Sequence, residues 1–226
     1  MFSDVTFSIN ENDKIALMGK NGAGKSTILK IIANASKPTS GTVTGPKDAV
    51  IAYLPQHFLT QDNVTVFEEN SKAFNEMQGM QEELDELNEQ LTIRTDYESD
   101  DYMKLIERVS ELSEQFYSVE EVNYDAEVEK VLKGLGFERK DFSRQTSEFS
   151  GGWRMRIELA KILLKKPDLI LLDEPTNHMD IESIQWLEDF LINSAKAVMV
   201  ISHDRAFVDN ITNRTIEVTM GRIYDY

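Results

Sequence analysis

The stretch Gly19-Lys20-Asn21-Gly22-Ala23-Gly24-Lys25-Ser26 decides the fold, because it fits the pattern G-x-x-x-x-G-K-[ST]. It lies between residues 14–18, an apolar run that predicts a strand, and residues 26–35, whose apolar spacing predicts a helix. Glycines let the backbone wrap a phosphate chain with its N–H groups inward, and a helix N-terminus favours an anion. These flanks argue against a chance glycine-rich turn, so the stretch predicts a site for nucleotide phosphates.

Two side chains of this stretch have predicted roles. Lys25 can reach the β- and γ-phosphates of a nucleotide, and the Ser26 hydroxyl can ligate Mg²⁺. With the adjoining Thr27, the predicted nucleotide-binding residues run without a gap from Gly19 to Thr27. The pattern strongly indicates nucleotide binding, but it does not indicate which enzyme carries it.

A second element delivers two carboxylates. Residues 169–174 read Leu-Ile-Leu-Leu-Asp-Glu, which is typical of a strand buried on both faces. Asp173 is suited to bind Mg²⁺ through water, and Glu174 is then placed to polarise an attacking water as a general base. Alone, such a run is also an ordinary strand and turn, but beside the glycine-rich loop it favours nucleotide hydrolysis.

A third element opens a helix with two glycines, in Phe149-Ser150-Gly151-Gly152-Trp153. The glycines expose backbone N–H groups and Ser150 adds a hydroxyl, which together make a second candidate anion site. The alternative is a plain N-cap followed by a loop. One chain hardly needs two phosphate cradles for one nucleotide unless the second serves a neighbouring molecule.

Composition narrows the class of protein. The 226 residues include no cysteine, which excludes disulfides, cysteine-based zinc sites and thiol chemistry. No run approaches the roughly 18 apolar residues that would span a bilayer, and the N-terminus lacks the pattern of a secretory signal. We therefore expect a cytoplasmic protein without a membrane segment.

The remaining pattern predicts an α/β chain. Helices are expected at 152–165 and 184–191, and a closing hairpin at 215–226. Further strands are expected at 5–9, 41–44, 49–54, 168–172 and 197–202.

The net charge of −16 belongs to one segment. Residues 74–130 hold 18 acidic and 4 basic residues, whereas the rest of the chain holds 22 and 20. Apolar residues recur at helical spacing from Met80 to Leu91 and from Leu105 to Phe116, with a polar break between them. This predicts an acidic antiparallel helical hairpin at about 76–117. It is either a solvated subdomain or a surface that docks on a partner, and its charge argues against nonspecific binding of nucleic acid.

The motifs together resemble the ATP-binding-cassette family. The usual Ser-Gly-Gly-Gln signature of that family meets the γ-phosphate of ATP held by the opposite cassette, a role the resemblance gives to Ser150, Gly151 and Gly152. Gln56 resembles the glutamine of the Q-loop, which contacts Mg²⁺ and water. Asp180, in Asn177-His178-Met179-Asp180, resembles the D-loop, and His203 resembles the switch histidine that contacts the γ-phosphate.

Trp153 indicates a subfamily within this family, because most cassettes have Gln at this position after Ser-Gly-Gly. A purely structural interpretation is that the indole packs on the first turn of the helix. Yet Ser-Gly-Gly-Trp-Arg-Met-Arg, with Glu-Pro-Thr-Asn-His-Met-Asp, is similar to the ABC-F subfamily of translation ATPases. That subfamily carries two cassettes on one chain, and the first has a helical insertion, the arm, where residues 74–130 lie. The resemblance identifies this chain as the N-terminal cassette.

The implied fold is a P-loop NTPase cassette with an antiparallel β subdomain and a helical signature subdomain carrying the acidic hairpin. One domain would span 1–226, with its nucleotide-binding core in 1–73 and 155–226 and its helical subdomain in 74–154. Only 24 residues precede Lys25, so the family's adenine-stacking aromatic is expected upstream of this sequence.

The implied function is hydrolysis of MgATP on the ribosome, active only in a pair with the second cassette of the full-length protein or with a homodimer mate. One alternative is the ATPase subunit of an ABC membrane transporter, against which Trp153 and the D-loop sequence argue. Another is a scaffolding cassette in which the nucleotide only holds a dimer together. Glu174 argues against it, because holding a dimer together requires no general base.

Overall fold

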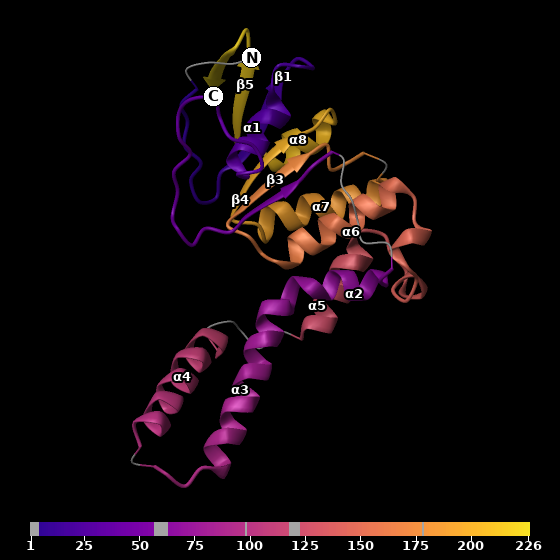
Figure 1. Ribbon diagram of the computed structural model, residues 1–226. Coiled ribbons are helices and arrows are strands. Elements are labelled where there is room, and N and C mark those ends of the chain that lie inside the picture. The colour runs from indigo at the N-terminus through magenta and orange to yellow at the C-terminus, as the bar shows by residue number, and fades with distance from the viewer. Residues whose placement is uncertain (1–4, 57–62, 98, 118–122, 178) are drawn as a thin grey trace.

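A six-stranded sheet forms the body of the chain in the computed structural model, which describes residues 5–56, 63–97, 99–117, 123–177 and 179–226 (Figure 1). The strand order is β2-β3-β4-β1-β5-β6. The first five are parallel, and β6 runs antiparallel to β5. The strands are β1 (Lys14–Gly19), β2 (Ile51–Leu54), β3 (Leu169–Asp173), β4 (Ala197–Ile201), β5 (Arg214–Thr219) and β6 (Arg222–Asp225).

Helices cover both faces of the sheet, which explains its apolar strands. Every residue of β3 and β4 is buried, as expected for parallel strands between two helical layers. One face packs on α1 (Lys25–Ile32). The other face packs on α6 (Gly151–Leu164), α7 (Ile181–Asn193) and α8 (Arg205–Ile211).

The predicted α/β P-loop fold is confirmed, but two predicted strands are wrong. Residues 5–9 form no strand, although Phe7 and Ile9 pack partly against the α1 face of the sheet. Residues 41–44 form none either, because they are exposed and have no apolar face to bury. The expected antiparallel β subdomain therefore does not form: among the described residues, β5 and β6 are the sole antiparallel strand pair, and they belong to the main sheet.

A group of short helices packs beside α6. It comprises α2 (Val66–Ser71), η1 (Lys72–Phe74) and α5 (Tyr124–Gly134), and the chain between α5 and α6 forms η2 (Arg139–Asp141) and η3 (Thr146–Glu148). Backbone hydrogen bonds join the start of α2 to the segment before α6: the N–H of Val66 donates to Arg144 O at 3.0 Å, and the N–H of Thr146 to Val64 O at 2.9 Å. The residues that enter α2 are thus fixed to the segment that leads into Ser150.

The acidic segment contains α3 (Asn75–Ile93) and α4 (Asp100–Tyr117), which form a hairpin that extends away from the sheet (Figure 1). The two helices pack together through buried Leu84 and Leu112. An ion pair of 2.8 Å joins Arg108 to Glu83 across them. No helix in the described ranges has the length and apolar character needed to cross a membrane.

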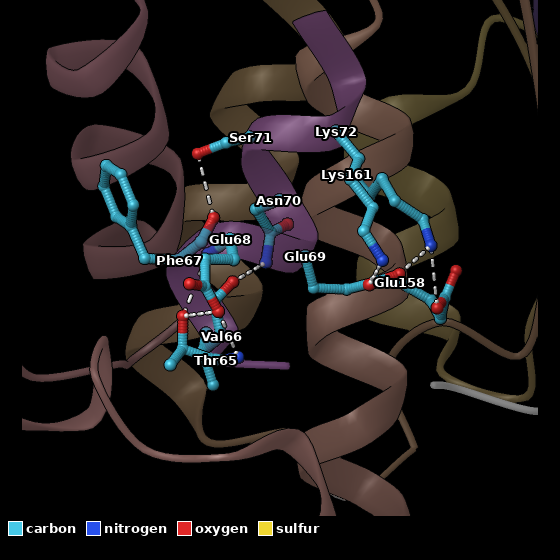
Figure 2. A network of polar contacts seen from close by, with 10 residues as sticks. All are labelled: Thr65, Val66, Phe67, Glu68, Glu69, Asn70, Ser71, Lys72, Glu158 and Lys161. Carbon is cyan, nitrogen blue, oxygen red and sulfur yellow. Dashed lines mark hydrogen bonds and ion pairs between the residues drawn. The ribbon is translucent and has the colours of Figure 1, made fainter. Parts of the chain in front are cut away.

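A buried carboxylate ties α2 to α6 (Figure 2). Glu69 is 3% exposed and lies 2.5 Å from the ammonium of Lys72 and 2.7 Å from that of Lys161. Lys161 also contacts Glu158 at 3.0 Å. The hydrogen bonds and charges of the two lysines outweigh the effect of burial, so the pKa of Glu69 lies below its ordinary value.

Replacing Glu69 with Gln is expected to destabilise the protein by about 3 kcal/mol at pH 7, because two ammonium groups lose their buried counter-charge. Since the folded-state pKa is lowered, this stability is present above the unfolded value and is lost as the pH falls through the folded value. Urea unfolding of E69Q and parent should therefore differ most at neutral pH and converge in acid. The exposed Glu86→Gln serves as control and should match the parent; equal stability of E69Q and parent at pH 7 contradicts the role of Glu69.

Candidate active site

The carboxyl ends of β1, β3 and β4 open into one cavity of about 390 Å³. Parallel strands present their carboxyl ends at one edge of a sheet, which is where α/β proteins commonly bind ligands. The lining residues come from four separate segments: Asn21, Gly22, Gly24, Lys25, Ser26, Thr27, Gln56, Asp173, Glu174, Ile201 and His203. The fold thus brings together residues almost two hundred positions apart.

The loop between β1 and α1 adopts a conformation that depends on its glycines. Gly19, Gly22 and Gly24 all have positive φ, at 145°, 79° and 99°. A Cβ on Gly19 would lie 2.5 Å from the carbonyl oxygen of Val218 on β5, so only glycine fits there. Gly24 is the N-cap of α1 and offers no side-chain cap, so the first N–H groups of the helix stay available to an anion.

Lys25 closes this loop on itself. Its ammonium donates to the carbonyl oxygens of Gly19 at 2.8 Å and Lys20 at 3.2 Å, while the side chain also lines the cavity. Three predicted nucleotide-binding residues, Gly19, Lys20 and Ala23, are not among the lining residues. They shape the loop instead: the N–H of Ala23 donates to Lys20 O at 3.1 Å.

The two carboxylates at the end of β3 lie on the inner side of the cavity, with Asp173 3% and Glu174 6% exposed. Glu174 has φ 57°, and its N–H donates to Ile201 O at 2.8 Å. Its Oε2 accepts the N–H of His203 at 3.2 Å, and its Oε1 lies 3.4 Å from His203 Nε2. A left-handed backbone costs about 1 to 3 kcal/mol in a residue other than glycine and is characteristic of functional sites.

The donor set fits a magnesium ion. Ser26, Gln56 and Asp173 offer hydroxyl, amide and carboxylate oxygens to the same cavity, and Mg²⁺ binds proteins through a few oxygens together with substrate phosphates. Nearby Tyr53 on β2 has a buried hydroxyl that finds no hydrogen-bond partner among the residues that the structure describes. Burial and the charge of Asp173 raise the pKa of Tyr53 to about 12, so the phenol stays neutral at pH 7.

The Ser150 loop lies outside this cavity. Ser150 has the extended backbone of an N-cap, but its side chain makes no capping hydrogen bond to α6. Ser150 and Gly151 are exposed, and a Cβ on Gly151 would meet nothing within 4 Å. The predicted N-cap position is therefore confirmed, and the hydroxyl and the helix N-terminus face open space rather than the cavity of their own chain.

Asp180 is also outside the cavity, as the N-cap of α7. Its Oδ1 accepts the N–H of Ser183 at 2.9 Å and its Oδ2 the Ser183 hydroxyl at 3.1 Å. These bonds, with a further one from Arg156, lower the pKa of Asp180 to about 2, so the carboxylate is charged at neutral pH. His178, in the same predicted loop, lies outside the described residues.

The indole of Trp153 packs on the first turn of α6, as one of the two interpretations of this residue predicts. Its ring lies 4.8 Å from that of Phe137 in an edge arrangement. The guanidinium carbon of Arg156 lies 4.3 Å from the centroid of the same Trp153 ring. The second interpretation, that Trp153 is diagnostic of a subfamily, depends on relatives rather than on geometry.

Sequence reasoning missed two residues. Ile201 lines the cavity as the last residue of β4, but a strand-ending isoleucine carries no signal that separates it from the core. Arg156 is 3% exposed and bonds Asp180 at 2.9 Å. A buried arginine on an apolar helix face could have drawn attention to it, because such a charge requires a partner.

Comparison with known proteins identifies close similarities. The family model described as ABC transporter matches residues 2–177. The chain is 40% identical over 223 residues to ABC transporter F family member 5 of Arabidopsis thaliana, covering 98% of this chain and 32% of that protein. It is 35% identical over 221 residues to the energy-dependent translational throttle protein EttA of Escherichia coli K12, covering 98% of this chain and 39% of that protein.

A solved structure shares the fold. A dimeric ATP-binding cassette in a post-hydrolysis state, bound to ADP and Pi, superposes with a TM-score of 0.66 at 21% identity. The match covers 100% of this chain and 89% of that one. By contrast, this chain spans only 32% and 39% of the length of the two curated relatives.

Proposed function

Because this chain belongs to the ABC transporter family of ATP-binding domains, we propose that it binds MgATP and hydrolyses it in a pair with a second cassette. The observation that carries the proposal is the convergence of Lys25, Glu174 and His203 on one cavity. A phosphate-binding loop with its lysine and a group that positions the attacking water are recurring parts of nucleotide hydrolysis, and the imidazole of His203 lies beside the carboxylate of Glu174.

Binding depends on the loop from Gly19 to Thr27. Its backbone N–H groups surround the phosphates, and Lys25 exchanges the carbonyl oxygens of its own loop for the β- and γ-phosphates. Ser26, Gln56 and Asp173 hold the magnesium ion that accompanies ATP. The ion supplies charge neutralisation at the phosphate oxygens.

Hydrolysis depends on Glu174. Its carboxylate accepts a proton from the attacking water, whose oxygen then bonds to the γ-phosphorus as the bond to ADP breaks. The N–H of His203 fixes one carboxylate oxygen at 3.2 Å, which orients the base. The imidazole of His203, which is largely exposed at the cavity edge, contacts the γ-phosphate.

Each complete site is shared between two cassettes. Ser150 and Gly151 carry anion-binding groups that face away from the cavity of their own chain, so they serve the nucleotide of an opposite cassette. The dimeric cassette to which this chain is similar supports such pairing. The opposite cassette is either the second one of a full-length protein or another copy of this chain.

The setting we propose is translation on the ribosome, in the cytoplasm, as the N-terminal cassette of an ABC-F protein. Support comes from the two relatives, one named as a family F member and one as a translational throttle protein. The hairpin of α3 and α4 is then the arm of that cassette. The division into a core of 1–73 and 155–226 and a helical subdomain of 74–154 forms part of the proposal. The membrane-transporter alternative shares the phosphate chemistry but is not favoured by these relatives.

We expect this chain by itself to hydrolyse ATP slowly, at a rate per chain that is proportional to the fraction of chains that are paired. The specific activity should therefore rise with protein concentration while the affinity of a fluorescent ATP analogue for the single chain stays constant. Parallel assays of hydrolysis and of sedimentation over a hundredfold range of concentration would test this. A specific activity independent of concentration, at a level where the chain is monomeric, would refute shared sites.

A further inference from the structure

A single buried guanidinium joins three elements near the Ser150 loop. Arg156, on α6, donates to the carbonyl oxygen of Leu135 at 2.9 Å, just beyond α5. It also donates to Asp180 Oδ2 at 2.9 Å and to Ser183 Oγ at 3.3 Å, at the start of α7. The ends of α5, α6 and α7 therefore meet at one charged side chain.

Two neighbours make this contact specific to arginine. The Trp153 ring covers the guanidinium at 4.3 Å, which is within the range of a cation–π interaction. Gly136 has φ 89°, and a Cβ there would lie 2.8 Å from Arg156 Nη1 and 2.9 Å from Ser183 Oγ. The three bonds all start at Nη1, so arginine is distinguished from lysine here by its flat guanidinium, which lies over the indole and is more weakly hydrated than an ammonium.

The position of this contact gives it a function beyond stability. α6 begins at the Ser150 loop, which serves the opposite cassette in the proposed function, and Asp180 is the last residue of the D-loop segment that begins at Asn177, three positions after Glu174. Resting on the proposed function, we propose that Arg156 is a positioning residue that holds the Ser150 loop of a chain at a fixed distance from its own D-loop. Closure of one shared ATP site is thereby coupled to the geometry of the other, and Trp153 covers the guanidinium end of the link.

The starts of α6 and α7 do not depend on this link for their own capping. Asp180 keeps its N-cap bond to Ser183 with or without Arg156, so α7 does not need the arginine to begin. The Ser150 side chain makes no capping bond to α6, so its hydroxyl is not used to start that helix. Arg156 therefore sets the relation of the two loops rather than the existence of either helix.

The first test measures this relation directly in the 226-residue chain. Because the sequence has no cysteine, spin labels at Ser147→Cys and Glu182→Cys, both exposed sites, report the distance between the Ser150 loop and α7. The parent should give one narrow distance distribution, and R156K a broad one. The matched control is Arg139→Lys, which changes an exposed arginine in an ion pair with Glu129 and should leave the distribution narrow.

The second test measures pairing. In an E174Q background, the dissociation constant of the ATP-bound pair should rise about tenfold in R156K, within the usual range of coupling between sites. ATP-analogue affinity of the single chain and the melting temperature at pH 7 act as readouts of folding, and the affinity should be unchanged because the cavity does not contain Arg156.

The outcomes separate the inference from the proposed function. If the E174Q parent binds ATP and pairs, and R156K pairs equally well with an unchanged distance distribution, the inference is wrong and the proposed function stands. A lower melting temperature alone, with pairing and distances unchanged, means that Arg156 is merely structural and also overturns the inference. If the E174Q parent does not pair with ATP at any concentration, the proposed function fails and the inference fails with it.

Discussion

Replacing Glu174 with Gln is expected to slow ATP hydrolysis by about a hundredfold to ten-thousandfold, the usual contribution of a positioned general base. Gln keeps the size of the side chain, and its amide oxygen can still accept the N–H of His203, which lies 3.2 Å from Oε2 of Glu174 in the parent. It loses the ability to take a proton from water. ATP binding should persist, because the loop from Gly19 to Thr27 is unchanged, and the pair should remain closed around unhydrolysed ATP.

Phosphate release by E174Q measures the first effect, and sedimentation with ATP and with ADP measures the second. The exposed Glu182→Gln, the same change on α7, is the matched control and should hydrolyse ATP as the parent does. Retained hydrolysis in E174Q would remove Glu174 as the base and direct attention to Gln56 or His203 as the group that orients water.

The second large effect is expected from Gly151→Asp, which should reduce hydrolysis by about a hundredfold or more, comparable to the loss of a preorganised anion-stabilising group. A Cβ at Gly151 meets nothing within 4 Å, and an acidic residue in the first turn of α6 is favourable to the helix dipole. The chain should therefore fold and bind ATP normally. The new carboxylate instead repels the γ-phosphate brought by the opposite cassette.

Gly79→Asp provides a control of the same chemistry on α3, where a Cβ also meets nothing within 4 Å. It should pair and hydrolyse as the parent does. Comparing G151D with G79D in assays of pairing, hydrolysis and thermal unfolding separates an effect at the shared site from an effect of added negative charge. Full activity in G151D would show that no phosphate approaches this loop.

The parts of this chain that could be predicted from sequence are those that depend on neighbours along the chain. The loop at Gly19–Ser26 is contiguous, and its glycines are required by backbone geometry, as the positive φ of Gly19, Gly22 and Gly24 bears out. β4 is apolar throughout and β3 is apolar up to Asp173, so their burial between two layers followed from composition alone. The spacing of apolar residues predicted both helices of the hairpin for the same local reason.

Prediction failed where a segment needed a distant partner. Residues 5–9 alternate like a strand, but no described strand pairs with them, and alternation reports only that Phe7 and Ile9 face the core. Residues 41–44 have strand-forming side chains and are exposed. A strand exists only with a hydrogen-bonded neighbour, and one sequence does not state which neighbour is available.

Lys25 and Arg156 differ in whether their roles could be predicted from the sequence. Lys25 was identified by its position in a spaced motif, because the phosphate-binding loop is built from adjacent residues. Arg156 follows Ser150 by only six positions, yet its bonds to Leu135 and Asp180 join residues 21 and 24 positions away. The sequence by itself determined the phosphate chemistry, since short-range backbone geometry encodes it. The tertiary structure alone decided which loops are held together, since a buried charge takes its partners from whatever the fold brings within hydrogen-bond distance.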